Sequence, residues 1–155
     1  MNTPTIETQR LILRRFTQDD ARALYQILSD EEVNTFLPMF PLKTMEEANA
    51  YIQKQYLDTY QEPFGYRYAV CLKTDHIPIG YVQVSSSESH DFGYGLRKDF
   101  WHKGIITEAG RAVVEELRNS GMPFITATHD IKNPRSGEVM KKLGMIYQYS
   151  YEEQW

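Results

Sequence analysis

The chain has 155 residues, of which 41% are hydrophobic and 25% are charged, a balance typical of one globular domain rather than of a disordered or fibrous chain. Its formal net charge of −4 argues against a nucleic-acid-binding protein, because such proteins present a basic face to phosphates. The single cysteine, Cys71, excludes an internal disulfide framework and any zinc site built from cysteines.

The first residues bear on where the protein works. The polar segment MNTPTIETQR lacks the apolar core of a signal peptide. No apolar run approaches the roughly 20 residues that a membrane helix needs. We therefore expect a cytoplasmic protein that forms one domain over residues 1–155, with neither nucleic acid nor a membrane among its partners.

The first third of the chain predicts one strand and two helices. Branched apolar residues between arginines over 10–16 predict the strand. Thr17 is expected to cap a helix whose apolar residues fall at helical spacing. The run at 33–43 is too rich in proline for a helix, and Thr44 with Glu47 forms a capping-box pair at the start of the second one.

The middle of the chain predicts three strands. Alternating or branched apolar residues occupy 66–72, 77–85 and 90–97, and short polar turns separate them. Connections this short favour antiparallel neighbours. We expect a three-stranded meander.

The last third begins with a helix from about Gly104, which should end at the Asn-Ser-Gly run of 119–121. Alternation over 124–130 predicts a strand. Because a helix connects it to the strand before Gly104, this strand should lie parallel to that one.

A short helix and a last strand complete the predicted elements. Asn133 is expected to cap the helix, with Pro134 in its first position and Gly144 at its end. Residues 145–153 predict the strand. The order β-α-α-β-β-β-α-β-α-β predicts an α/β (α+β) fold, with a mixed, mostly antiparallel central sheet flanked by about four helices.

The stretch FWHKGIITEAG, from residue 100 to 110, predicts an anion site. The amides at the start of a helix have no internal partners and lie at the positive end of its dipole. Gly104 would let a ligand approach the backbone, and His102 and Lys103 add positive character. A phosphate or pyrophosphate fits this arrangement. The alternative is that Gly104 only turns the chain and Lys103 is solvated.

Three other kinds of site are not supported. Gly93-Tyr94-Gly95 begins like a dinucleotide fingerprint but lacks the third glycine and an immediate helix. The chain has no P-loop pattern. Its four histidines are scattered without metal-ligand spacing, so we expect no metal.

Two motifs resemble a known family. GYGLRKDFWHKGIITEAG resembles the acetyl-CoA signature of the GNAT superfamily of N-acetyltransferases, in particular of the Rim-type branch that acetylates ribosomal-protein N-termini. THDIKNPRSGEVMKKLGM is similar to the second half of that signature. The opening segment 6–30 also resembles that branch, so the resemblance covers nearly the whole chain. It implies the GNAT fold, with a splayed pair of parallel strands, and acetyl-CoA as the acetyl donor that leaves CoA as product.

The resemblance also implies a binding site and a reaction. The pantetheine arm would pair with the strand that ends near Leu96, and the pyrophosphate would lie on the amides of residues 102–107. The reaction would be direct attack of a neutral amine on the acetyl carbonyl, with no covalent enzyme intermediate. The expected cofactor-binding residues are Leu96, Arg97, Trp101, His102, Lys103, Gly104, Ile105, Ile106, Thr107 and Asn133.

The chain departs from the family pattern at three positions. Lys98 stands where the Rim-type pattern has proline, and Ile106 stands where it has glycine or alanine. Ile106 would crowd the phosphates unless it points into the core. Met140 replaces the tyrosine that often serves as general acid. In the Rim-type branch a serine at the position of Ser136 is the substitute, so Ser136 is the candidate acid.

The general base is expected at the start of the signature strand. His90 and Asp91 are the candidates, with Glu88 just before them. Neighbours on a strand point to opposite faces, so His90 and Asp91 cannot both line the slot. The alternative is that all three belong to a polar turn. His129 is expected to be structural.

The acceptor side is predicted from the apolar loop before the second helix. Phe36, Met39 and Phe40 lie where the family shapes its acceptor pocket, although the loop could instead cover the core. The predicted function is acetyl transfer to a primary amine, of a protein N-terminus or of a small molecule. The alternative is a non-catalytic acyl-CoA-binding sensor or interaction module, since the usual tyrosine acid is missing.

Family members add one more strand beside the segment 124–130, whereas this sequence stops at Trp155. Without that strand a sheet edge would stay open, which folded proteins avoid. We therefore expect further residues beyond Trp155, or a partner chain such as the second copy of a homodimer, to fill this place.

Overall fold

The structure, a computed structural model, describes residues 2–34 and 41–150. The acceptor candidates Phe36, Met39 and Phe40 lie outside these residues.

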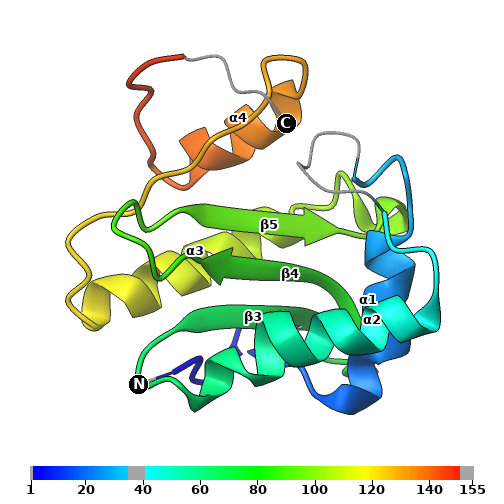
Figure 1. The fold of residues 1–155 in the computed structure, drawn as a ribbon. Helices are drawn as coiled ribbons and strands as arrows, with labels where there is room; N and C mark the ends of the chain where they lie inside the picture. The colour runs from blue at the N-terminus through cyan, green and yellow to red at the C-terminus, as the bar shows by residue number, and fades with distance from the viewer. Residues whose placement is uncertain (1, 35–40, 151–155) are drawn as a thin grey trace.

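Figure 1 shows one sheet between helices. In chain order the elements are β1 (Ile6–Glu7), β2 (Leu11–Arg14), the 3₁₀ turn η1 (Gln18–Asp20), α1 (Ala21–Leu28), α2 (Met45–Ile52), the π turn η2 (Gln53–Leu57), the 3₁₀ turn η3 (Thr59–Gln61), β3 (Tyr66–Leu72), β4 (Pro78–Val84), β5 (Phe92–Leu96), the 3₁₀ turn η4 (Lys98–Phe100), α3 (Ile105–Asn119) and α4 (Pro134–Lys142).

The sheet has the order β1-β2-β3-β4-β5, and every pair of neighbours is antiparallel. This confirms the meander predicted over β3, β4 and β5. Alternate side chains of these strands point to opposite faces of the sheet and pack into two separate hydrophobic cores. One core packs against α3, and the other packs against α1 and α2. The α/β class, the mostly antiparallel sheet and the four α-helices of the described residues agree with the prediction.

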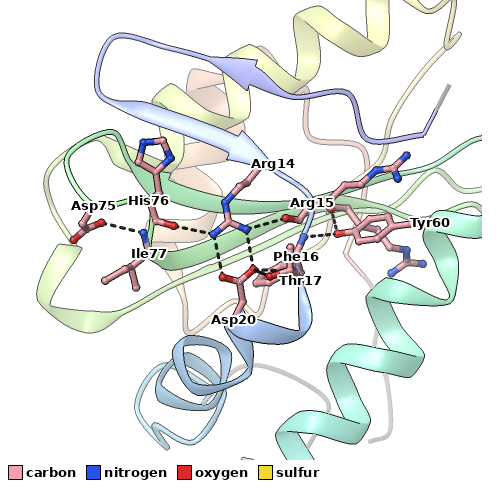
Figure 2. Close-up of polar contacts among 10 residues, drawn as sticks. Arg14, Arg15, Phe16, Thr17, Asp20, Tyr60, Asp75, His76 and Ile77 are labelled. Carbon is pink, nitrogen blue, oxygen red and sulfur yellow. Dashed lines mark hydrogen bonds and ion pairs between the residues drawn. The ribbon is translucent and has the colours of Figure 1, made fainter.

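A partly buried ion pair stabilises the connection from β2 to α1 (Figure 2). Arg14 donates from both terminal nitrogens to Asp20, at 2.8 and 3.0 Å. The Asp20 carboxylate also accepts from the Thr17 amide at 2.7 Å. Thr17 therefore begins a helical segment as predicted, but its first turn is η1, and α1 starts only at Ala21.

The second helix begins where its capping pair predicted. The Thr44 hydroxyl accepts from the Glu47 amide at 3.1 Å, which is one half of the capping box. The Glu47 carboxylate reaches the amide of Lys43, one residue before Thr44, at 2.9 Å. The first contact satisfies a backbone donor that a helix start leaves without a partner, and the second connects the residue before the cap to the first turn of the helix.

A glycine lies at each end of α3, as predicted from the sequence. Gly104 precedes the helix with φ of +73°, and Gly121 follows it with φ of +84°. Both values lie in the left-handed region that favours glycine. Between them the apolar side of α3 packs on the sheet through residues such as Ile105, Ala109 and Val113.

The two strands expected after α3 are not formed in the described residues. Over 124–130 a single parallel bridge joins Asp91 to Thr126, and 145–150 contains no strand, while 151–153 lie outside the described residues. The reason is that apolar alternation makes a strand only where a neighbouring strand and a packed face are available. Here Phe124 is 52% exposed and Ile146 is 80% exposed. The splayed parallel pair is thus reduced to one bridge.

The last helix has the predicted ends but not the predicted cap. α4 follows Asn133, carries Pro134 in its first position and is followed by Gly144 with φ of +90°. The Asn133 side chain makes no capping hydrogen bond. In Figure 1 α4 lies beyond β5, on the far side from β4. No helix of the described residues is long and apolar enough to cross a membrane.

Candidate active site

The outer edge of β5 has backbone groups that face away from the sheet. The Asp91 carbonyl and the Arg97 amide bond to residues in and beside β4, at 2.8 Å each. Because hydrogen-bonding direction alternates along a strand, Tyr94 and Leu96 direct their backbone groups to the opposite side. At the near end of this edge the Phe92 amide donates to Thr126 at 2.7 Å. No described strand pairs with Tyr94 or Leu96 there, so an extended ligand could add along this edge.

Trp101 closes the far end of the same edge. Its indole Nε1 donates to the Leu96 carbonyl at 2.9 Å. An extended ligand at β5 could therefore use the backbone of Tyr94 and the amide of Leu96, but not the Leu96 carbonyl. This narrows the expected role of Leu96 to hydrogen-bond donation.

The loop between β5 and α3 turns sharply and is open on its outside. His102 and Gly104 both have positive φ, of +66° and +73°, with the exposed Lys103 between them. A Cβ built on Gly104 would meet only an Arg10 guanidinium nitrogen, at 3.7 Å. Gly104 therefore turns the chain, and its missing side chain also leaves room for a ligand at the helix start.

Cations gather around two aromatic rings of this loop. Arg97 and Lys103 lie 5.4 and 5.5 Å from the centre of the Phe100 ring. The Arg135 guanidinium, from α4, lies 5.2 Å from the centre of the Trp101 ring. Such contacts hold the cations in place. Asp99 of the same loop pairs with Arg97 at 2.9 Å, so the excess positive charge here comes from Lys103 and Arg135. In a chain of net charge −4 this locally basic surface suits an anionic ligand.

The isoleucines of the first α3 turn do not crowd the loop. Ile105 and Ile106 are 3% and 8% exposed and belong to the core on the α3 side of the sheet. The departure at Ile106 is accommodated because its side chain points into that core. Thr107 is half-buried beside it.

A hydrogen-bond network between the N-terminal hairpin and α3 holds the loop that connects β5 to α3. Glu108 accepts from the Thr8 hydroxyl at 2.6 Å, and from the Arg10 amide and Nε at 3.0 and 2.7 Å. Arg10 also donates from Nη1 to the Lys103 carbonyl at 2.9 Å. Burial raises the pKa of Glu108, but the hydrogen bonds from Thr8 and Arg10 outweigh it and leave that pKa below its usual value. No local pattern in the sequence indicates this network, because Arg10 and Glu108 are 98 residues apart.

We expect Glu108→Gln to weaken CoA binding about threefold to tenfold, since the loop loses charge-assisted hydrogen bonds and the pair is partly exposed. The lowered pKa makes Glu108 stabilising above its unfolded value of about 4.3, and this contribution disappears as the pH falls through the lower folded value. The variant should therefore melt earlier than the parent at pH 7, and this difference should shrink as the pH falls through the lowered folded pKa of Glu108.

Titration calorimetry with CoA and melting curves at several pH values check this prediction. Glu115→Gln is the matched control, because Glu115 is an exposed carboxylate on the same helix. Equal affinity and equal melting temperatures for the two variants at pH 7 would contradict a role for the network.

Ser136 lies in the first turn of α4 and contacts β5. Its hydroxyl makes a short hydrogen bond with the Tyr94 hydroxyl, and Tyr94 also donates to the Ser136 carbonyl at 3.0 Å. Burial raises the pKa of Tyr94, and the hydrogen bond with Ser136 partly offsets this. Met140, one turn further along α4, is buried in the core. The sequence singled out Ser136 but not Tyr94, which comes from a different element.

The base candidates lie at the opposite end of β5 from Leu96. His90 precedes the strand with φ of +49°, so the argument from strand alternation does not apply to it. Its ring lies edge-on to Phe124 at 5.0 Å, and its buried Nδ1 has no hydrogen-bond partner among the described residues. Asp91 is exposed beside the bridge to Thr126. No contact brings His90 to Ser136.

The remaining sequence candidates occupy peripheral positions. Glu88 is exposed in the turn before His90. His129 packs on Gly137, where an added Cβ would meet its Nε2 at 2.9 Å. Lys98, which replaces the family proline, pairs with Glu32 at 2.5 Å between exposed side chains, an ion pair of little energetic weight.

Comparison with known proteins identifies the family of this chain. The family model described as an acetyltransferase (GNAT) domain matches residues 10–146. The chain belongs to the GNAT acetyltransferase family. The match confirms the family and the enzyme class predicted from the sequence, and acetyl-CoA is the acetyl donor of GNAT enzymes. A comparison with curated protein sequences found no match.

Solved structures of GNAT acetyltransferases share the fold. A GNAT-family acetyltransferase from Bacillus anthracis is 24% identical, with a TM-score of 0.79 over 92% of this chain and 84% of the other. RimL, a ribosomal-protein N-acetyltransferase in complex with coenzyme A, is 18% identical, with a TM-score of 0.77 over 90% and 82%. A microcin self-immunity acetyltransferase in complex with acetyl-CoA and AMP is 20% identical, with a TM-score of 0.71 over 88% and 79%.

Proposed function

We propose that this GNAT domain is a cytoplasmic enzyme that transfers the acetyl group of acetyl-CoA to a primary amine by direct attack. The observation that carries the proposal is the continuity of two features. The open edge of β5 at Tyr94 and Leu96 leads directly into the basic loop at Gly104, where α3 begins. A ligand with an extended arm and a pyrophosphate needs these two features in this order: a strand edge for the arm, and then a helix start for the pyrophosphate.

The residues fit CoA in a simple division of roles. Tyr94 and Leu96 offer backbone groups to the pantetheine arm, and the amides of residues 102–107 face the pyrophosphate. Lys103 adds positive charge, and Arg97 offers a guanidinium that Asp99 holds at 2.9 Å. Asn133 has a side chain that does not cap α4. Acetyl-CoA supplies an activated acetyl group as a thioester. Ser136, in the first turn of α4, is placed to hold the sulfur as it leaves.

The attacking amine must be neutral and must lose a proton during the reaction. His90 and Asp91 stay the proposed bases, acting directly or through water, at the end of β5 that lies away from the loop. Phe36, Met39 and Phe40 are the proposed acceptor-binding residues. The Rim-type resemblance favours a protein N-terminus as the acceptor, and the self-immunity role of the microcin enzyme is the reason to include small-molecule amines in the proposal.

An amine panel tests the proposal. We expect thiol release from acetyl-CoA with at least one peptide N-terminus or small primary amine, and none with an N-acetylated version of the same compound. Calorimetry with CoA should show binding in the same preparation.

The second candidate function is acyl-CoA binding without catalysis. It is favoured by Met140, which cannot donate a proton from the position where the family often has tyrosine. CoA binding without turnover on any amine of the panel would support this candidate, and acetylation of an amine would exclude it.

A further inference from the structure

The hydroxyl groups of Tyr94 and Ser136 form one pair between β5 and the first turn of α4. We propose that Tyr94 is the positioning residue of Ser136, orienting the serine hydroxyl so that it donates to the sulfur of the departing thiolate. This inference rests on the proposed acetyl transfer. It gives a role to a tyrosine that was not a candidate from the sequence, beside a last helix in which Met140 replaces the tyrosine that often serves as general acid.

Tyr94 is held firmly enough for this role. Its ring packs against Phe92 at 5.8 Å between centres. Phe92 belongs to the core on the α3 side, and Tyr94 packs against that core. Its backbone belongs to the open edge of β5, where the pantetheine arm is proposed to lie. The same residue therefore links the ligand-binding edge to the first turn of α4.

Counting the protons of the pair gives two arrangements. Tyr94 has one proton and two acceptors at Ser136, the hydroxyl and the carbonyl. In the first arrangement Tyr94 donates to the carbonyl, and Ser136 donates to Tyr94. In the second, the Ser136 hydroxyl donates its hydrogen bond to an anion, and the Tyr94 hydroxyl donates to the oxygen of the Ser136 hydroxyl. Each hydroxyl donates one hydrogen bond in both arrangements, so the change leaves no donor unused.

Tyr94 should keep its proton throughout. A thiol titrates near 8.5 and a tyrosine near 10, and burial raises the pKa of Tyr94. Transfer of its proton to a thiolate would therefore be unfavourable. A hydrogen bond from Tyr94 instead polarises the Ser136 hydroxyl and makes it a stronger donor, as chains of hydroxyls do in a poorly solvated site.

The electrons balance without an added reagent. The amine nitrogen forms the new bond to the acetyl carbon with its lone pair. The carbon–sulfur bond breaks with its electron pair on sulfur. The amine proton passes to water, and the thiolate is held by Ser136 until it takes a proton from solvent.

Tyr94→Phe keeps the ring and removes the hydroxyl. We expect kcat to fall about tenfold, the value of one well-placed hydrogen bond, with the KM for acetyl-CoA changed less than about twofold. Tyr147→Phe is the matched control, because Tyr147 makes a similar hydrogen bond to Ser150, at 2.6 Å, while its side chain is 71% exposed. The control should keep the parental kcat.

A measurement on bound CoA tests the pair without turnover. The thiolate absorbance of bound CoA, followed against pH, should show the thiol ionising at lower pH in the parent than in Tyr94→Phe. Tyr147→Phe should match the parent. Ser136→Ala should raise this pH further, and adding Tyr94→Phe to it should change nothing more, because Tyr94 acts through Ser136.

Three results would overturn the inference: an unchanged kcat in Tyr94→Phe, an unchanged thiol titration, or additive losses in the double variant. Failure of the proposed function would look different. A parent protein without turnover on any amine would refute acetyl transfer, while the titration of bound CoA would still decide whether Tyr94 and Ser136 act together on sulfur.

Discussion

Gly104→Glu should reduce CoA affinity by at least about 100-fold while the chain stays folded. The glutamate would place bulk and negative charge at the start of α3, where the pyrophosphate is proposed to lie. Two like charges about 4 Å apart near a protein surface repel by about 4 kcal/mol. An Arg10 guanidinium nitrogen lies 3.7 Å from the position of the new Cβ, but Glu108 already pairs with Arg10. Neutralisation by Arg10 should therefore be incomplete.

Gly121→Glu separates this effect from backbone strain. Gly121 lies at the other end of α3 with φ of +84°, and no atom lies within 4 Å of a Cβ built there. Each glutamate should cost about 1 kcal/mol or more of stability, because both sites are left-handed. Calorimetry with CoA should show lost affinity only at position 104. Equal CoA affinities for the two variants would contradict the placement of the pyrophosphate.

The sequence predicted the elements whose signals are local. The strand at Tyr66–Leu72 and the ends of α3 were predicted correctly, since alternation and a left-handed glycine are readable within a few residues. The expected strand at 124–130 failed because pairing depends on a neighbour and not on its own pattern.

The site was predictable in part for the same reason. The glycine, the basic pair and the helix start are adjacent in sequence, so the loop could be found. The contact of Tyr94 with Ser136 joins residues 42 positions apart and depends on where α4 lies against β5. His90 was placed on a strand, but its left-handed conformation puts it in the turn before β5. Neither the Tyr94–Ser136 contact nor the left-handed conformation of His90 can be predicted from the spacing of apolar residues in the sequence.

Ser136→Ala should lower kcat about 100-fold and leave CoA affinity within about twofold. The expected loss is that of a single group that stabilises charge or transfers a proton in the transition state. The structure argues against the alternative that the Ser136 hydroxyl only caps backbone amides of its own turn. The hydrogen bond of its hydroxyl runs to Tyr94 on β5, and Tyr94 can still donate to the carbonyl of residue 136, at 3.0 Å, after the hydroxyl is removed.

The position of α4 should therefore survive the substitution, and the loss should fall on the chemical step. Ser120→Ala is the control, because the Ser120 hydroxyl donates to the Leu117 carbonyl at 2.8 Å at the end of α3, within its own turn. It should change stability slightly and kcat not at all. A Ser136→Ala enzyme with parental kcat and a lower melting temperature would show that this serine, like Ser120, is structural. Parental melting with a 100-fold lower kcat requires instead that the hydroxyl acts on the thiolate, since nothing else in the first turn of α4 would have changed.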